Sequence, residues 1–233
     1  MSQPDVTEAS IRLNKHIAQH LAIGRRQADF LIEQGRVSVD GEKPQLGARI
    51  DPTQAVVKVD DQTIQPQTNQ SFAYLILNKP IGYICSRRQQ GLAPTIYSLL
   101  PPEYQHLKPV GRLDKDSSGI LLMTNDGQLA HKLTHPGSQK NKQYEVLLDR
   151  SLKQEHQDLI ANKGVSLEDG PSKLHLLRQN NNRSWLITMH EGRNRQIRRT
   201  FRSLGYEVKA LHRINFGDYQ LGDLKPGQYK KAD

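Results

Sequence analysis

Two aspartates, Asp114 and Asp116, stand two residues apart in the segment GRLDKDSSGILLMT, directly before an apolar run that begins at Ile120. A carboxylate here could act as a nucleophile or as a general base. Together with Glu191, the pair could instead bind Mg²⁺, as a metal-dependent nuclease requires. Both acids could also do no more than hold the turn that leads into a strand. The residue types alone leave these three roles open.

Other groups with catalytic potential are weaker candidates. His131 and His135 are four residues apart without a third ligand nearby, so a surface or packing role is favoured over zinc binding. Ser117 and Ser118 lack the Gly-x-Ser-x-Gly elbow of serine hydrolases. The sequence contains no Walker loop and no Gly-x-Gly-x-x-Gly motif. We therefore expect no nucleotide cofactor, no metal and no other cofactor.

The charge of the chain points to a polyanionic partner. The formal net charge is +9 and the pI is about 9.6. Between His190 and Arg213 there are seven Lys or Arg residues, six of them Arg, against two Glu. A solvated basic helix is the plain alternative, but the planar fork of Arg matches phosphate better than Lys does. This density of Arg favours nucleic acid as the partner.

The composition is that of a soluble globular protein of one large domain or two small ones. Of the 233 residues, 35% are hydrophobic and 24% are charged. No apolar run approaches the ~20 residues of a membrane span, and the N-terminal residues lack the features of a signal peptide. The single cysteine, Cys85, cannot form an internal disulfide and suits a reducing compartment. We therefore expect a cytoplasmic protein without a membrane partner.

The elements that must position these residues fall into two predicted domains. Over residues 11–60, Leu13, Ile17 and Leu21 predict one helix, and GRRQADFLIEQG predicts a second, with Ala28, Leu31 and Ile32 facing inward and Gly35 as its stop. RVSVDGEKP then predicts a hairpin that turns at Asp40-Gly41, and AVVKVD predicts a further strand. The basic residues on or beside these helices could form one face for RNA: Arg12, Lys15, Arg25 and Arg26.

The polar segment 61–71 is predicted to be a linker, and residues 72–233 are predicted to form the second domain. Apolar runs predict strands, including a strand, a Pro-Gly turn and a second short strand within AYLILNKPIGYICS. Helices are predicted for GQLAHKLT, LKQEHQDLIAN and NRQIRRTFRSL. Strands dominate without strict alternation, which favours an α+β fold with a mixed, largely antiparallel sheet.

The first domain resembles a known RNA-binding module. RLNKHIAQHLAIGRRQADFLIEQGRVSVDGE, residues 12–42, is similar to the alpha-L module of the ribosomal-protein-S-four-like family. In that family, the paired helices present basic residues to structured RNA. Asp29 is a departure, because it places an acid on the second helix.

The second domain resembles the RsuA-type family of ribosomal RNA pseudouridine synthases. The resemblance runs in order through five segments and, with the alpha-L module, covers about residues 11–230: NKPIGYICS, GRLDKDSSGILLMTNDG, KQYEV, EGRNRQIRRTFRSLGYEV and LHRINFGDYQLGDLKPGQY. It implies an enzyme that isomerises a specific uridine of ribosomal RNA to pseudouridine without a cofactor.

The resemblance also assigns roles to residues. Asp114 matches the catalytic aspartate, Tyr144 the active-site tyrosine, and Arg198 the basic residue that pairs with the aspartate. Without the resemblance, Tyr144 would read as an ordinary aromatic residue of a strand. Arg112 is expected to hold the displaced nucleotide. The remaining arginines of the basic segment are expected to engage RNA phosphates: Arg193, Arg195, Arg199 and Arg202.

The RNA target is less defined. The segments LEDGP and EGRNRQIRR favour an enzyme of the large ribosomal subunit, whereas chain length and module order also suit small-subunit enzymes. A synthase acting on tRNA and a non-enzymatic RNA-binding assembly factor are the alternatives. The expected partner is ribosomal RNA, free or in an assembling subunit, and the protein is expected to be a monomer.

Overall fold

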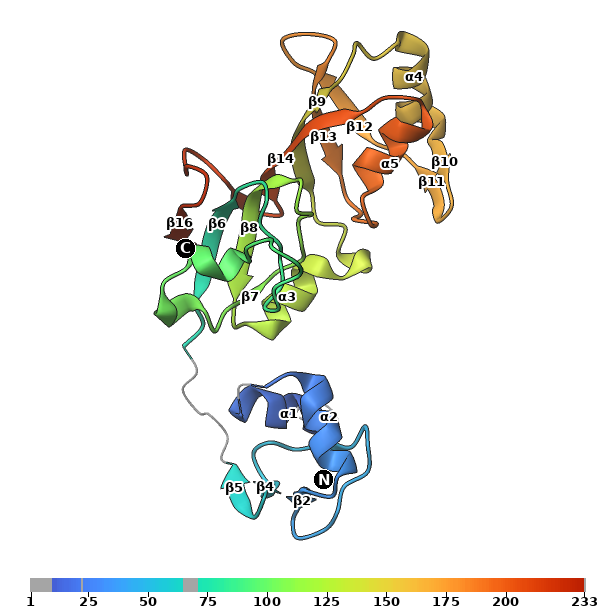
Figure 1. Cartoon of the computed structure of the whole chain (residues 1–233). Coiled ribbons are helices and arrows are strands. Elements are labelled where there is room, and N and C mark those ends of the chain that lie inside the picture. Colours follow the sequence, from blue (N-terminus) through green and yellow to red (C-terminus); the bar gives the residue numbers. More distant parts are fainter. Residues whose placement is uncertain (1–9, 22, 65–70, 233) are drawn as a thin grey trace, which may run out of the picture. The chain divides into compact units, whose positions relative to one another are not determined.

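The computed structural model of the chain describes residues 10–21, 23–64 and 71–232. The chain divides into two compact units, Met1–Ser71 and Phe72–Asp233 (Figure 1). Residues 65–70 of the predicted linker lie outside the described residues. Its beginning differs from the prediction, because Gln62–Ile64 forms strand β5 of the first unit, paired with the strand before it. Within the described ranges, no helix is both long and apolar enough to cross a bilayer.

The first unit packs two helices on short strands around one apolar core. Its elements are β1 (Ile11–Arg12), α1 (Leu13–His20), α2 (Arg25–Glu33), β2 (Val37–Val39), β3 (Arg49–Ile50), β4 (Val57–Val59) and β5 (Gln62–Ile64). Strands β2, β4 and β5 form one antiparallel sheet, and β1 pairs with β3.

The helix predictions for this unit are confirmed apart from one residue. Ala28, Leu31 and Ile32 of α2 are buried, and Gly35 ends the helix at φ +67°. Its amide donates to the carbonyl of Ile32, which is the usual way a left-handed glycine stops a helix. Leu21 differs from the prediction: it follows the end of α1 and is 39% exposed.

The predicted turn at Asp40-Gly41 forms, but it does not join two paired strands. Both residues have positive φ, and Val39 and Glu42 exchange backbone hydrogen bonds across the turn. The pairing ends at this single bridge. Strand β2 instead pairs with β4, so a longer connection replaces the expected hairpin.

The second unit is built on a nine-stranded sheet. Its elements are β6 (Tyr74–Lys79), η1 (Ile96–Leu99), η2 (Pro102–Tyr104), β7 (Lys108–Pro109), β8 (Ser118–Thr124), α3 (Gly127–Thr134), η3 (Pro136–Ser138), β9 (Lys142–Leu148), α4 (Gln154–Asp158), η4 (Leu159–Lys163), β10 (Val165–Leu167), β11 (Gly170–Ser172), β12 (His175–Arg178), β13 (Ser184–Met189), α5 (Gln196–Ser203), β14 (Val208–Phe216), β15 (Tyr219–Gln220) and β16 (Tyr229–Lys231).

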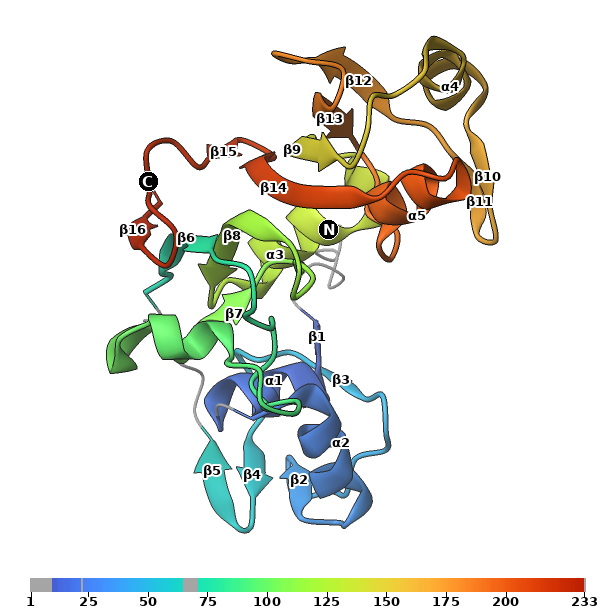
Figure 2. The same cartoon turned by 45° about the horizontal axis from the view of Figure 1, so that its top comes forward.

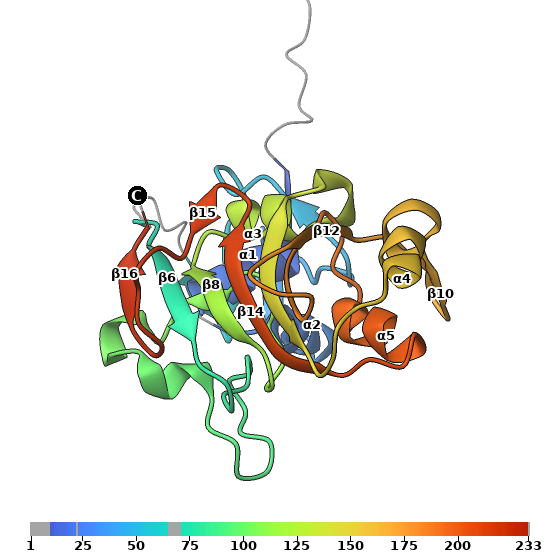
Figure 3. The ribbon, with the colours of Figure 1, turned by 90° about the horizontal axis from the view of Figure 1, so that it is seen from above.

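The sheet has the strand order β12-β13-β9-β14-β8-β6-β16, with β15 added to β14 and β7 added to β8. Figures 2 and 3 show it as one twisted layer, with α5 beside β14. Every pairing in it is antiparallel except that of β14 with β8, which is parallel. The predicted α+β class with a mixed, largely antiparallel sheet is therefore confirmed.

Three apolar cores lie against this sheet, and β8 contributes to two of them. Ile120 and Leu122 enter one core, whereas Leu121 and Met123 enter the core on the opposite face. A strand buried on both faces requires an unbroken apolar run, which accounts for ILLM. The third core lies between the β9–β13–β14 part of the sheet and α5, with Trp185 and Phe201 among its members.

The three helices predicted for this unit form, the middle one as α4 continued by the π-helical turn η4. The second short strand predicted after the Pro-Gly turn is wrong, because only an isolated bridge between Ile84 and Thr95 forms there. The hairpin formed by β10 and β11 and the edge strands β12 and β16 were not predicted from the sequence.

Candidate active site

The loop that carries Asp114 connects β7 to β8 and is fixed through its backbone. The side chain of Lys79 is fully buried, and its Nζ donates to the carbonyl of Ser117 at 2.6 Å. The amide of Gly82 donates to the carbonyl of Lys115 at 2.8 Å. Burial lowers the pKa of Lys79, and the negative charge of Asp114 acts in the opposite direction. A buried ammonium group therefore stabilises the loop beside the acids.

Leu113 anchors the same loop in the core. Its side chain is 8% exposed and belongs to the core cluster that contains Tyr144. The thiol of Cys85 lies against its backbone, 3.3 Å from the carbonyl oxygen and 3.5 Å from the amide nitrogen. The residue that follows, Asp114, is thereby presented at the edge of this core with 33% of its side chain exposed.

Gly119 allows β8 to approach β14 closely. Its φ is +109°, and a Cβ atom placed there would lie 2.1 Å from the carbonyl oxygen of Arg213. Arg213 is itself buried, and its guanidinium donates twice to the carbonyl of Ile120, at 2.9 and 2.7 Å. The sequence did not single out Arg213 or Lys79, because nothing in a basic residue's neighbours shows that tertiary packing will bury it.

Helix α5 presents its arginines in a row because its other side is buried. Ile197, Thr200 and Phe201 face the core. The arginines fall at the spacing i, i+3, i+4 and i+7, which places them along the opposite side: Arg195, Arg198, Arg199 and Arg202. Arg195 precedes the first turn with φ +45°, a left-handed conformation that non-glycine residues rarely adopt.

Asp114 has Arg195 as its cationic neighbour. Nη1 of Arg195 lies 3.4 Å from Oδ2 of Asp114. The same guanidinium binds Asp116 bidentately, with Nη1 donating to Oδ1 at 3.0 Å and Nη2 donating to Oδ2 at 2.7 Å. One arginine therefore connects the two acids of the loop.

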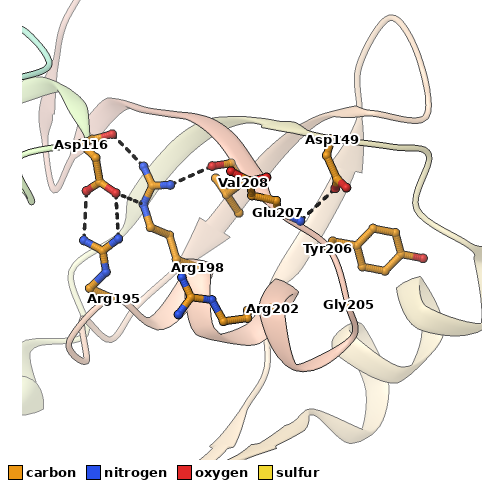
Figure 4. Close-up of a pocket in the computed structure, with 9 residues that line it drawn as sticks. All are labelled: Asp116, Asp149, Arg195, Arg198, Arg202, Gly205, Tyr206, Glu207 and Val208. Carbon is orange, nitrogen blue, oxygen red and sulfur yellow. Dashed lines mark hydrogen bonds and ion pairs between the residues drawn. The ribbon is translucent and has the colours of Figure 1, made fainter.

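Arg198 is the second cation of this network (Figure 4). Its Nε lies 3.3 Å from Oδ2 of Asp116, and its Nη2 donates to the carbonyl oxygen of Asp116 at 2.7 Å. Its Nη1 donates to the carbonyl of Val208 at 2.8 Å, which ties α5 to β14. The hydrogen bonds of Arg195 and the charge of Arg198 hold the pKa of Asp116 below its usual range.

This geometry differs from the predicted pairing of Arg198 with Asp114. Arg198 binds Asp116, and Arg195, which was predicted to contact phosphate, is the arginine in contact with Asp114. The physical reason is the left-handed backbone of Arg195, which precedes the helix on the side of the loop. Sequence spacing on an ideal helix does not contain that information.

Tyr144 lies on β9 opposite Arg213 of β14, and its side chain is 8% exposed. Its hydroxyl forms no hydrogen bond with another residue in the described ranges, and it is not among the fully buried polar atoms that lack a partner. The ring is thus packed in the core beside Leu113 while the hydroxyl keeps some access to the exterior.

Two of the arginines predicted to contact RNA phosphates are paired with an acid of the same unit. Arg193 and Arg199 both bind Asp169 at the tip of the β10–β11 hairpin, with nearest N–O distances of 2.9 and 2.6 Å. They connect this hairpin to α5, a contact the sequence did not predict. Arg112 is exposed and forms no ion pair with any residue in the described part of the chain.

The basic residues of the first unit remain available to a partner. Arg12, Arg25 and Arg26 are exposed and Lys15 is half-buried. Asp29, which departs from the alpha-L pattern, accepts a hydrogen bond from Nδ2 of Asn14 at 2.9 Å. This bond joins α1 to α2, so the acid has a structural partner within the unit.

The Mg²⁺ alternative finds no matching set of ligands. Glu191 binds Arg193 and Gln196, and both oxygens of Asp116 are occupied by Arg195. Among the residues that the structure describes, no three His, Cys, Asp or Glu side chains gather as a metal site.

Comparison with known proteins identifies the family of the chain. The model of the family described as RNA pseudouridylate synthase matches residues 73–203. A relative from Aquifex aeolicus named "Uncharacterized RNA pseudouridine synthase" is 36% identical over 232 residues, covering 96% of this chain and 90% of the relative. The Escherichia coli protein named "Dual-specificity RNA pseudouridine synthase RluF" is 34% identical, covering 96% of this chain and 76% of that protein.

A solved structure described as a pseudouridylate synthase matches with a TM-score of 0.69 and 31% sequence identity, covering 96% of both chains. The family match includes the loop that carries Asp114, Tyr144 and all of α5. The chain therefore belongs to the RNA pseudouridylate synthase family, whose members are isomerases that act on RNA.

Proposed function

We propose that this synthase isomerises a specific uridine of ribosomal RNA, in the large subunit, with Asp114 as the catalytic carboxylate. The observation that carries the proposal is the position of Asp114. It stands on a loop held by buried contacts, it is partly exposed, and a guanidinium lies 3.4 Å away. Asp116 is unsuited to the role, because both of its oxygens are engaged by Arg195.

Formation of pseudouridine breaks the bond between ribose and the base nitrogen, turns the uracil, and rejoins it through carbon. No group enters or leaves and no electron is transferred. A carboxylate beside the anomeric carbon can stabilise positive charge there, attack it covalently, or take a proton from the sugar. Each of these routes uses Asp114, and all three benefit from the fixed cation Arg195.

We assign Tyr144 to the pocket that receives the target base. Its ring is packed against the core and its hydroxyl has no partner among the described residues, so it can offer a face to the base and a donor near the sugar. Tyr144→Phe is expected to retain stacking, and Tyr144→Leu is expected to lose it. If both variants keep the full rate, Tyr144 is only structural.

Arg198 is proposed to act through Asp116. It binds the side chain and the carbonyl of that residue, and so fixes the end of the loop that begins at Asp114. Arg198→Ala is expected to lose most of the turnover while retaining part of the RNA binding. Near-normal turnover in this variant would remove Arg198 from the mechanism.

RNA binding is proposed to involve both units. Arg112 is exposed next to the catalytic loop and is suited to hold the displaced nucleotide. The first unit, with Arg12, Lys15, Arg25 and Arg26, is proposed as an alpha-L module that forms a second contact with the same RNA. Two weak contacts on one RNA raise the effective concentration of each.

The test is release of tritium from ribosomal RNA labelled at carbon 5 of uridine. Wild type and Asp114→Asn are compared on unmodified large-subunit and small-subunit RNA, each tested separately. Release from large-subunit RNA by wild type alone is the expected result. Release that persists in Asp114→Asn overturns the catalytic assignment, and release from small-subunit RNA or tRNA instead overturns the target.

A further inference from the structure

An open cavity of about 460 Å³ lies beside the loop that carries Asp114 and Asp116. Figure 4 shows its walls. Arg195, Arg198 and Arg202 of the α5 region form one wall, and the backbone from Gly205 to Val208 and the side chain of Asp149 form the other. The volume falls within the range of pockets that hold small ligands.

The cavity adjoins the loop of Asp114 through two of its lining residues, Arg195 and Asp116. Arg195 lines the cavity and also lies 3.4 Å from Asp114. Asp116, which also lines it, is in contact with both Arg195 and Arg198. An RNA that places one nucleotide at Asp114 therefore has a neighbouring nucleotide close to this cavity.

The arginines that line the cavity differ in whether they have an acidic partner. Arg195 and Arg198 are matched by Asp116. Arg202 is exposed, and its side chain forms no ion pair or hydrogen bond with any residue in the described ranges. An arginine that is held near a site without a partner is suited to a phosphate group, because its planar fork binds two oxygens at once.

The opposite wall accepts hydrogen bonds. Oδ1 of Asp149 accepts from the amide of Glu207 at 2.8 Å, and this bond holds the pKa of Asp149 below its usual range. Glu207 binds Lys209 at 2.7 Å through one oxygen. Carboxylates accept hydrogen bonds and cannot donate them when ionised. They match the exocyclic amino groups of cytosine, adenine and guanine, whereas uracil has no amino group and offers fewer donors for them.

We propose that this cavity holds a nucleotide that adjoins the target uridine in the substrate RNA, with its phosphate on Arg202 and an amino-bearing base edge toward Asp149 and Glu207. The inference rests on the proposed function, because it takes RNA at Asp114 as given. It makes the cavity a determinant of which uridine is chosen. Phosphate contacts position an RNA, and contacts to base edges read its sequence.

The first test removes the cation. Arg202→Ala is expected to raise the KM for the substrate RNA about tenfold and to change kcat by less than twofold. It is also expected to lower the slope of log Kd against log salt concentration by about 0.7 to 1, the contribution of one phosphate contact. Arg202→Lys should restore part of the affinity.

The matched control is Arg178→Ala, which removes another exposed arginine of the same unit. It should leave KM and the salt slope unchanged. Equal effects of Arg202→Ala and Arg178→Ala, or a loss in kcat without a change in KM, would overturn the phosphate site.

The second test changes the hydrogen-bonding groups of the wall that carries Glu207. The modified uridine is mapped, and each of the two nucleotides on either side of it is replaced in turn by uridine. Wild type is expected to lose five- to tenfold in kcat/KM at one of these positions. Glu207→Gln, which introduces a donor without changing size, is expected to reduce that loss to twofold or less. An unchanged preference in Glu207→Gln would refute the base contact.

These results are separable from failure of the proposed function. If wild type releases no tritium from any ribosomal RNA, the proposed function fails. The salt slope of Arg202→Ala, measured by binding of ribosomal RNA to the Asp114→Asn protein, still reports on the phosphate contact. If tritium is released but neither Arg202→Ala nor Glu207→Gln has the stated effect, the cavity proposal alone fails.

Discussion

Substitution of Gly119 by Ala is expected to destabilise the catalytic unit more than any ordinary loop mutation. An added Cβ would lie 2.1 Å from the carbonyl oxygen of Arg213 and 2.5 Å from its nitrogen. Both neighbours are backbone atoms of β14, so no side chain can rotate away, and the strands must separate by about an ångström. This separation weakens the parallel pairing of β8 with β14, which consists of His212 with Ser118 and Arg213 with Gly119.

The loss of stability expected for Gly119→Ala has two contributions. A φ of +109° costs an L-residue about 1–2 kcal/mol in backbone strain. Weakening two interstrand hydrogen bonds at about 1 kcal/mol each, together with the charge-assisted bonds from Arg213 to Ile120, adds about 2–4 kcal/mol. We expect a loss of about 3–6 kcal/mol in the free energy of unfolding, which is in the range of severe single substitutions.

Gly82 provides a control that separates strain from collision. It adjoins the same loop at φ +93°, and a Cβ there would meet no atom within 4 Å. Gly82→Ala should therefore cost only about 1–2 kcal/mol. Urea unfolding followed by the fluorescence of Trp185, the sole tryptophan, reports on this unit because the residue is buried in its core. If Gly119→Ala costs no more than Gly82→Ala, the close approach of the two strands is not a constraint.

Three further predictions follow from buried or capping groups. Asp126→Ala removes the side-chain cap of α3 and should cost about 1–2 kcal/mol in urea unfolding, whereas Asp126→Asn should keep most of the stability. Lys79→Met leaves the carbonyl of Ser117 without its buried donor and should cost about 2–3 kcal/mol in the same assay, with a parallel loss of activity. Burial, aided by His20, lowers the pKa of His16 to about 4, so its NMR titration should have a midpoint near 4. Because an unfolded histidine takes up its proton near pH 6.5, His16 stabilises the first unit above that pH, and on the order of 2–3 kcal/mol should be lost as pH falls toward 4. A titration midpoint near 6.5 would contradict this account.

Much of the fold follows from local sequence patterns. The run ILLM predicts a strand buried on both faces, and the arginine-rich segment predicts a helix with one apolar side. Strands β12 and β16 have mostly exposed residues, so no periodicity marks them. The pairing partner of β16, strand β6, also lies far away in the chain. Such strands are set by the sheet they join and could not be predicted from their own residues.

The candidate site, like the fold, could be predicted from the sequence only in part. The type and spacing of Asp114 leave three roles open, and the resemblance of its segment to a known family is what selects it. Its neighbour was expected to be Arg198 and is Arg195, because a left-handed residue before α5 turns that side chain toward the loop. Lys79 and Arg213 are buried cations whose positions depend on strands brought together from distant parts of the chain.

The parallel pairing of β8 with β14 has a consequence for how this enzyme loses activity. Asp114 enters the sheet through β8, whereas Tyr144 and the arginines of α5 belong to the β9–β14 side, and two residue pairs join these strands. A small opening of this seam separates the acid from its cation before the strands themselves unfold, because it first loosens the packing of Leu113 against Tyr144 and of Ile120 against Phe216. Heat or urea should then abolish turnover before the circular dichroism signal is lost. Turnover is therefore the more sensitive measure of local unfolding in this protein.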